Sequence, residues 1–122
     1  MTNDWRLIRP ARNNAITWMP WLLLPQSSVA VQVRVMVTPG HTRAHQCIVV
    51  ESDGQTAVFL GDAASWPIHM ERLAWVSAHD LEPMQSIETK RRLARWAVEA
   101  HVLLIFEHHP QVLAGYLHVT EP

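Results

Sequence analysis

The chain has 122 residues, with 10 basic and 11 acidic side chains and a formal net charge of −1 at pH 7. This length fits one domain with its own core, and the balanced charge lacks the basic footprint that nucleic acids and anionic membranes require. We therefore exclude both from the expected partners. The single cysteine, Cys47, lies in an apolar run, which is typical of a buried thiol in a reducing compartment, so we expect a cytoplasmic location.

Residues 1–28 do not predict a defined element. Basic residues precede an uncharged apolar run at 15–24 and small residues follow it, which is the order of a secretory signal peptide. Against that alternative, Pro20 interrupts the run, and cleavage after Ala30 would leave only a stump of the strand that follows. The run is also too short to span a bilayer. We expect an N-terminal arm over residues 1–28 and one domain over residues 29–122.

The first predicted strand covers residues 31–37, where valine alternates with other residues. It runs into Pro39 and Gly40, and the loop beyond them carries His41 and His45. Because proline fixes one backbone dihedral and glycine permits a sharp turn, His41 should point away from the strand end. Histidine is the commonest metal ligand, and a loop on a rigid strand suits one. A solvated turn that happens to contain two histidines is the alternative.

Two β-rich runs follow, at residues 47–51 and 56–60. The residues between them include Asp53-Gly54, and Asp-Gly between such runs predicts a hairpin. Both runs are apolar on both faces, so we expect them inside a layered sheet. The second run ends in Gly61-Asp62, which puts a carboxylate at a strand end. An aspartate that caps the next element is the alternative for Asp62.

Residues 63–85 lack clean periodicity, and they predict a long loop that contains His69 and a short helix at 70–77. An amphipathic helix is predicted at 87–100, with Ser86 as its N-cap. Its basic residues indicate a solvated face; they are Lys90, Arg91, Arg92 and Arg95.

Residues 102–106 and 115–119 predict two further strands, and the first of these runs into Glu107-His108-His109. Three strand ends in succession therefore present His41, Asp62 and His108. If these strands end on one edge of the sheet, the three side chains should converge. Each residue alone is a weak signal, whereas the repeated placement is a stronger one.

These residues resemble those of the metallo-β-lactamase-fold hydrolases, which include lactonases and hydroxyacylglutathione hydrolases. The resemblance covers about residues 31–119 and depends on Thr-Pro-Gly-His-Thr-x-x-His at 38–45, on Gly61-Asp62, and on Phe106-Glu107-His108 followed by the Gly115 strand. A subgroup known mostly as hydrolases is also similar at Trp75, Asp80, Pro83 and Glu88-Thr89-Lys90. The resemblance implies an α/β (α+β) fold that is the C-terminal half of an αββα sandwich, with one main helix near 87–100.

The resemblance also implies roles for single residues. His41 is similar to the third histidine of the family's first metal site, and His108 to a histidine of the second. Asp62 is similar to the carboxylate that bridges the two metals, and His45 to a histidine that supports the turn. The implied cofactor is a pair of zinc ions, with manganese or iron as alternatives, because imidazole and carboxylate suit these metals and a bridged pair holds a hydroxide for attack on a carbonyl.

The sequence departs from the family in two respects. No H-x-H-x-D-H motif, from which the family takes its other ligands, occurs in the 122 residues, so the catalytic set is incomplete. His109 stands where the subgroup usually has aspartate, which puts the hydrogen bonding behind His108 in doubt. His69 matches a subgroup histidine in the loop over the site, with a surface histidine as the alternative.

Three functions follow from these residues. We favour the C-terminal half of a metal-dependent hydrolase of esters, lactones or thioesters, truncated and inactive by itself, whose complete form acts on a small-molecule substrate. The alternatives are a noncatalytic relic that serves as an interaction module, and a site completed by a partner chain. Because half a sandwich leaves one sheet face without cover, we also expect association with a second copy.

Overall fold

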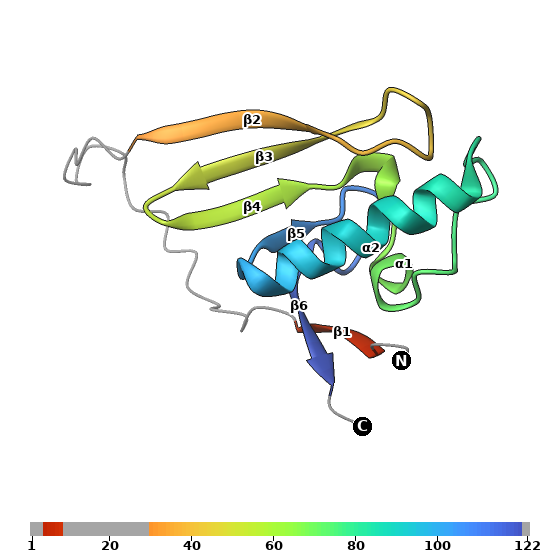
Figure 1. Ribbon diagram of the computed structural model, residues 1–122. Helices are drawn as coiled ribbons and strands as arrows, with labels where there is room; N and C mark the ends of the chain where they lie inside the picture. The colour runs from red at the N-terminus through yellow and green to blue at the C-terminus, as the bar shows by residue number, and fades with distance from the viewer. Residues whose placement is uncertain (1–3, 9–29, 121–122) are drawn as a thin grey trace.

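The computed structural model describes residues 4–8 and 30–120. The signal-peptide alternative and most of the predicted N-terminal arm fall outside these residues. In chain order the elements are β1 (Asp4–Ile8), β2 (Val31–Val37), β3 (Gln46–Ser52), β4 (Gln55–Phe59), the 3-10 turn η2 (Gly61–Ala63), α1 (Pro67–Glu71), α2 (Pro83–Glu99), β5 (Leu103–Ile105) and β6 (Ala114–Thr120) (Figure 1).

The strands form one six-stranded sheet in the order β1-β6-β5-β4-β3-β2. β4 and β5 are parallel, and the other neighbouring strands are antiparallel. The helices lie between β4 and β5 in sequence, and α2 crosses one face of the sheet (Figure 1). The predicted α+β class is therefore confirmed. None of the helices among the described residues has the length and apolarity needed to cross a membrane.

The hairpin of β3 and β4 turns at the predicted dipeptide. Asp53 and Gly54 have φ values of 50° and 70°. Two successive residues with positive φ are what a tight hairpin turn requires, because that turn matches the twist of its strands.

Only one face of the sheet is covered by α2. Cys47, Val49, Val58 and Leu104 are fully buried there, together with Leu93, Ala94 and Ala97 of the helix. On the opposite face Val33, Val35 and Ile48 keep 66%, 59% and 45% of their surface exposed. The expectation that residues 47–51 and 56–60 are covered on both faces is therefore wrong, because the cover is a tertiary property that a run of apolar residues does not specify.

Both helices begin earlier than predicted. α1 spans Pro67–Glu71, so the helix predicted at 70–77 is wrong beyond residue 71, and α2 starts at Pro83 rather than at 87. In each helix proline occupies the first turn, where its missing N–H has no helical partner to lose and its fixed φ is already helical. Ser86 is therefore inside α2 and is not its N-cap.

β1 was not predicted. It pairs with β6 at the far edge of the sheet, and its Trp5 is buried in the core.

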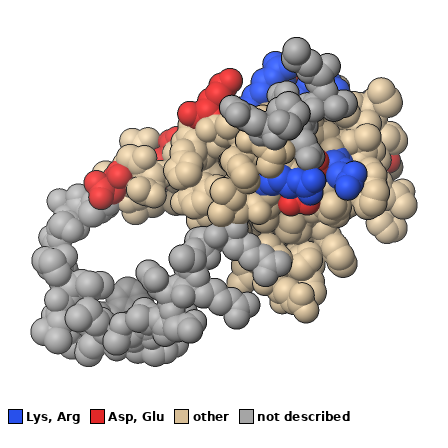
Figure 2. All heavy atoms as spheres, turned by 90° about the horizontal axis from the view of Figure 1, so that it is seen from below, with Lys and Arg blue, Asp and Glu red and all other residues tan. Residues whose placement is uncertain are grey.

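On the face shown in Figure 2, basic and acidic side chains lie next to one another among uncharged residues.

Candidate functional site

The loop after β2 is held against the start of α2. The Gly40 carbonyl accepts the Glu82 N–H at 3.0 Å, and the Thr89 hydroxyl donates to the Pro39 carbonyl at 2.6 Å. Gly40 has a φ of +144°, and a Cβ there would lie 2.5 Å from the Ser86 Cα. The loop can approach the helix this closely only because residue 40 has no side chain.

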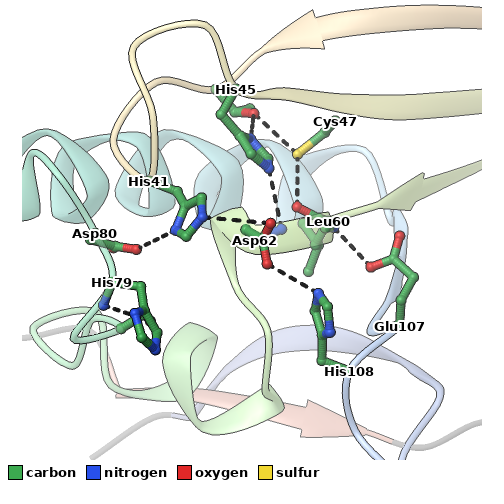
Figure 3. A network of polar contacts seen from close by, with 12 residues as sticks. His41, His45, Cys47, Leu60, Asp62, His79, Asp80, Glu107 and His108 are labelled. Carbon is green, nitrogen blue, oxygen red and sulfur yellow. Dashed lines mark hydrogen bonds and ion pairs between the residues drawn. The ribbon is translucent and has the colours of Figure 1, made fainter.

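Three strand ends bring His41, Asp62 and His108 together (Figure 3). His41 follows β2, Asp62 lies in η2 after β4, and His108 follows β5. His108 Nε2 is 3.0 Å from Asp62 Oδ1, and His41 Nε2 is 3.6 Å from Asp62 Oδ2. One carboxylate thus has an imidazole at each of its oxygens, and with side chains 22–52% exposed the group is open to small molecules.

Asp80 fixes the orientation of His41. Its carboxylate has only 3% of its surface exposed and lies 2.9 Å from His41 Nδ1 (Figure 3). Because a carboxylate only accepts hydrogen bonds, His41 Nδ1 carries the proton of this hydrogen bond, and Nε2 is the ring nitrogen that faces Asp62. His41 Nε2 and Asp62 Oδ2 lie 3.6 Å apart, so these two atoms could bind one cation together. The sequence did not predict this pair, because Asp80 lies in a loop without periodicity rather than at a strand end.

His45 supports the backbone of Asp62 instead of joining the cluster. Its Nε2 accepts the Asp62 N–H at 3.2 Å, so its Nδ1–H is left to donate to the Thr38 hydroxyl at 2.8 Å. Thr38 also contacts the Cys47 thiol, which donates to the Leu60 carbonyl. Burial lowers the pKa of His45 and raises the pKa of Cys47 to about 11, so both stay neutral and this chain of hydrogen bonds persists at pH 7.

The other predicted or neighbouring residues shape loops. The Glu107 carboxylate accepts the Gly61 N–H at 2.8 Å, a role that sequence analysis missed. His109 Nδ1 accepts the Val112 N–H at 2.8 Å, and its ring packs edge-on against Trp66 with centroids 4.9 Å apart. The His109 side chain thus shapes the loop after His108, where an aspartate would accept the same backbone N–H groups.

A buried cation lies behind this site. Lys90 keeps 1% of its surface exposed and donates to the Trp75 carbonyl, so its assignment to a solvated face is wrong. Burial lowers the pKa of Lys90 to about 8, and the negative charge of Asp80 opposes that shift. His69, on α1, also has a pKa lowered by burial and by the charge of Lys90. The sequence pattern misassigned Lys90 because four basic residues lie close together on this helix. With 3.6 residues per turn their side chains point in different directions, and only that of Lys90 faces inward.

We expect the contribution of Lys90 to the stability of the fold to rise between pH 8 and pH 10.5, and the raised pKa of Cys47 to oppose this rise above about pH 9. In this range the unfolded chain keeps a proton on Lys90 that the folded chain has lost, so folding is favoured as protons become scarce. For a pKa of about 8 against 10.5 the gain is about 3 kcal/mol at most. Urea unfolding across this range measures it. Lys90→Met should abolish the rise and the exposed control Arg95→Met should keep it; equal slopes in the two variants would contradict the assignment.

The donor atoms at Asp62 fit a metal in kind but not in number. Imidazole nitrogen and carboxylate oxygen are atoms that suit zinc. A histidine that binds a metal through one ring nitrogen usually donates a hydrogen bond to a carboxylate through the other, and His41 has this contact with Asp80. Within residues 4–8 and 30–120, however, no group of three or more His, Cys, Asp or Glu side chains is placed to enclose an ion. The side chains present would hold part of a metal site.

Comparisons with known proteins agree with this fold. A scan of family models finds no match to the sequence, and a search of curated proteins finds none. Among solved structures, a probable metal-dependent hydrolase from Staphylococcus aureus is similar, with a TM-score of 0.64 and 32% identity over 67% of this chain and 29% of that one.

Two further structures share the fold. AidC, a dizinc quorum-quenching lactonase, has a TM-score of 0.62 and 14% identity, covering 83% of this chain and 36% of its own. The hydrolase AbOPH, of the β-lactamase superfamily, has a TM-score of 0.57 and 19% identity, covering 74% and 35%. The chain thus spans about a third of the length of these proteins. The chain therefore has part of the metallo-β-lactamase fold and shares it with these three structures.

Proposed function

We propose that this chain supplies part of the metal centre of a metal-dependent hydrolase, with His41, Asp62 and His108 as ligands. The observation that carries the proposal is the Asp62 carboxylate, which has an imidazole Nε2 at each oxygen. A structural ion pair would need only one imidazole. A carboxylate between two imidazoles would instead let Asp62 hold a metal together with either histidine.

Zinc bound there would supply a Lewis acid for a carbonyl and activate water. This chain's own residues would keep the ligands in place. Asp80 holds the Nδ1 proton of His41, so that Nε2 is the ligand atom. His45 and Glu107 hold the backbone of the Gly61-Asp62 turn. The substrate class that fits is a carbonyl ester, a lactone or a thioester, in agreement with the lactonase among the similar structures.

The remaining ligands would have to come from outside the residues described above. The sequence has no H-x-H-x-D-H, and three side chains leave each of two metal positions short of ligands. We therefore propose that the chain by itself binds zinc weakly and is not an active hydrolase. A second chain that carries the missing ligands would complete the site.

Zinc titration followed by calorimetry tests the ligand assignment. Wild type should bind zinc well below the affinity of a complete site, and His41→Ala and Asp62→Asn should each weaken binding at least about tenfold, because metal affinity falls 10- to 100-fold even when only supporting residues are lost. His118→Ala, on β6 and away from the site, is the matched control and should change nothing. Equal zinc affinity in all four proteins would reject these ligands.

Hydrolysis of a chromogenic lactone or ester, with and without zinc, tests the activity. We expect the chain to hydrolyse it no faster than buffer that contains the same zinc. Tight stoichiometric binding with turnover that His41→Ala abolishes would instead show a site completed within this protein or by its own copies, and would overturn the proposal that the chain alone is inactive.

A further inference from the structure

Asp80 and Lys90 are two buried side chains of opposite charge. The Asp80 carboxylate is 3% exposed and Lys90 is 1% exposed. Asp80 lies in the loop between α1 and α2, and Lys90 lies within α2, two turns after its start. The charge of Asp80 acts on the Lys90 ammonium, since it opposes the effect of burial on the lysine pKa.

A buried ammonium is costly, so its contacts are informative. Moving a charged group out of water costs several kcal/mol unless hydrogen bonds and an opposite charge offset it, and an apolar side chain of similar volume would fill the same space without that cost. The Lys90 ammonium donates to the carbonyl of Trp75, which belongs to the same loop as Asp80. Lys90 therefore holds this loop by a hydrogen bond at Trp75, and its positive charge favours the negative charge of Asp80 in the same loop.

The loop in turn reaches the site at His41. The Asp80 carboxylate receives the His41 Nδ1–H at 2.9 Å, and the Leu81 N–H donates to the His41 carbonyl at 3.1 Å. A shift of the loop would therefore move the acceptor of the Nδ1 proton. Without that acceptor, a neutral imidazole in water prefers the proton on Nε2, the nitrogen that faces Asp62.

We propose that Lys90 is a positioning residue for the site: it holds Asp80 where the carboxylate fixes the His41 proton on Nδ1 and leaves Nε2 free to bind a metal. The metal part of this inference rests on the proposed function. The effect on the His41 proton does not, because it concerns only residues of this chain.

Nuclear magnetic resonance of the histidine ring nitrogens measures the tautomer directly. At a pH of about 7.5, below the pKa of Lys90, wild-type His41 should have its proton on Nδ1, the nitrogen that contacts Asp80. Lys90→Met should shift it towards the Nε2–H form, as Asp80→Ala does. Arg95→Met, an exposed cation on the same helix, should keep the wild-type spectrum. An unchanged tautomer in folded Lys90→Met would overturn the proposal.

Two further variants separate the charge from the hydrogen bond. Lys90→Arg keeps the positive charge and should restore the Nδ1–H form, whereas Lys90→Gln keeps a donor for Trp75 but has no charge, and should shift the tautomer. Lys90→Gln also serves if the Met variant fails to fold. A merely structural lysine would give the wild-type tautomer in every folded variant, and that result would reject the inference.

Zinc affinity measured on the same proteins distinguishes the inference from the function on which it rests. We expect Lys90→Met to bind zinc about tenfold more weakly than wild type and Arg95→Met to bind it equally well. If wild type binds no zinc and the tautomer still depends on Lys90, the proposed function fails and the positioning role stands. If zinc binds but Lys90→Met binds it equally well, the role of Lys90 at the metal is rejected.

Discussion

Gly40→Ala should destabilise the fold by about 3–5 kcal/mol and move His41 away from Asp62. A Cβ on residue 40 would lie 2.5 Å from the Ser86 Cα and 2.6 Å from its backbone nitrogen, distances that real Cβ atoms do not show. Because these are backbone atoms of a helix, no side-chain rotation relieves the overlap. The cost combines overpacking with the strain of a φ of +144° for a residue with a Cβ. Urea unfolding measures it.

Gly54→Ala is the matched control for this prediction. Gly54 also has a positive φ, +70°, but nothing lies within 4 Å of a Cβ there. This variant should therefore lose only the conformational part, about 1 kcal/mol. If the two variants are equally stable, the close approach of the loop to α2 does not hold His41 in place.

Strands and strand ends were the predictable part of this fold, because local pattern specifies them. Alternating valines gave β2, and the Asp-Gly pair gave the hairpin with its two positive φ values. The proposed ligands could be predicted for a related reason. Strand ends that face one edge of a sheet bring together residues that the chain keeps apart, and His41, Asp62 and His108 each follow a strand.

The support behind the ligands could not be predicted in this way. Asp80 reaches His41 from a loop without periodicity, and Lys90 differs from its arginine neighbours only in which way α2 turns it. Ser86 looks like a helix cap, yet it packs against Gly40 with its hydroxyl buried and, among the described residues, without a hydrogen-bond partner. Each of these contacts depends on how two elements pack against each other. No local sequence pattern specifies that packing, because it is set by the whole fold.

The uncovered sheet face raises a separate expectation, on the state of the protein in solution. By register, Val33 lies beside Val50, and Val35 beside Ile48, which in turn lies beside Phe59. The face is therefore a continuous apolar surface over three strands. β2 is also an edge strand of the sheet. An exposed apolar strand at a sheet edge is the usual starting point for association between chains.

We expect the purified protein to associate in a concentration-dependent manner, and the double substitution Val33→Lys with Val35→Lys to weaken this association about 100-fold or more. Burying one valine stabilises by about 1.5 kcal/mol, and each 1.4 kcal/mol is a tenfold change in the equilibrium constant. Two lysines facing their copies would add repulsion. Analytical ultracentrifugation over a wide concentration range measures the effect.

Met84→Lys is the control, because Met84 is 78% exposed on α2 rather than on the sheet and should leave association unchanged. Equal weakening by Met84→Lys would locate the contact elsewhere. A wild-type protein that stays monomeric at high concentration and melts cooperatively would show that this face needs no partner. That result would remove the support that exposed valines give to an interaction module, whereas association lost only in the β2 variant would identify this sheet face as the surface through which two copies of the chain associate.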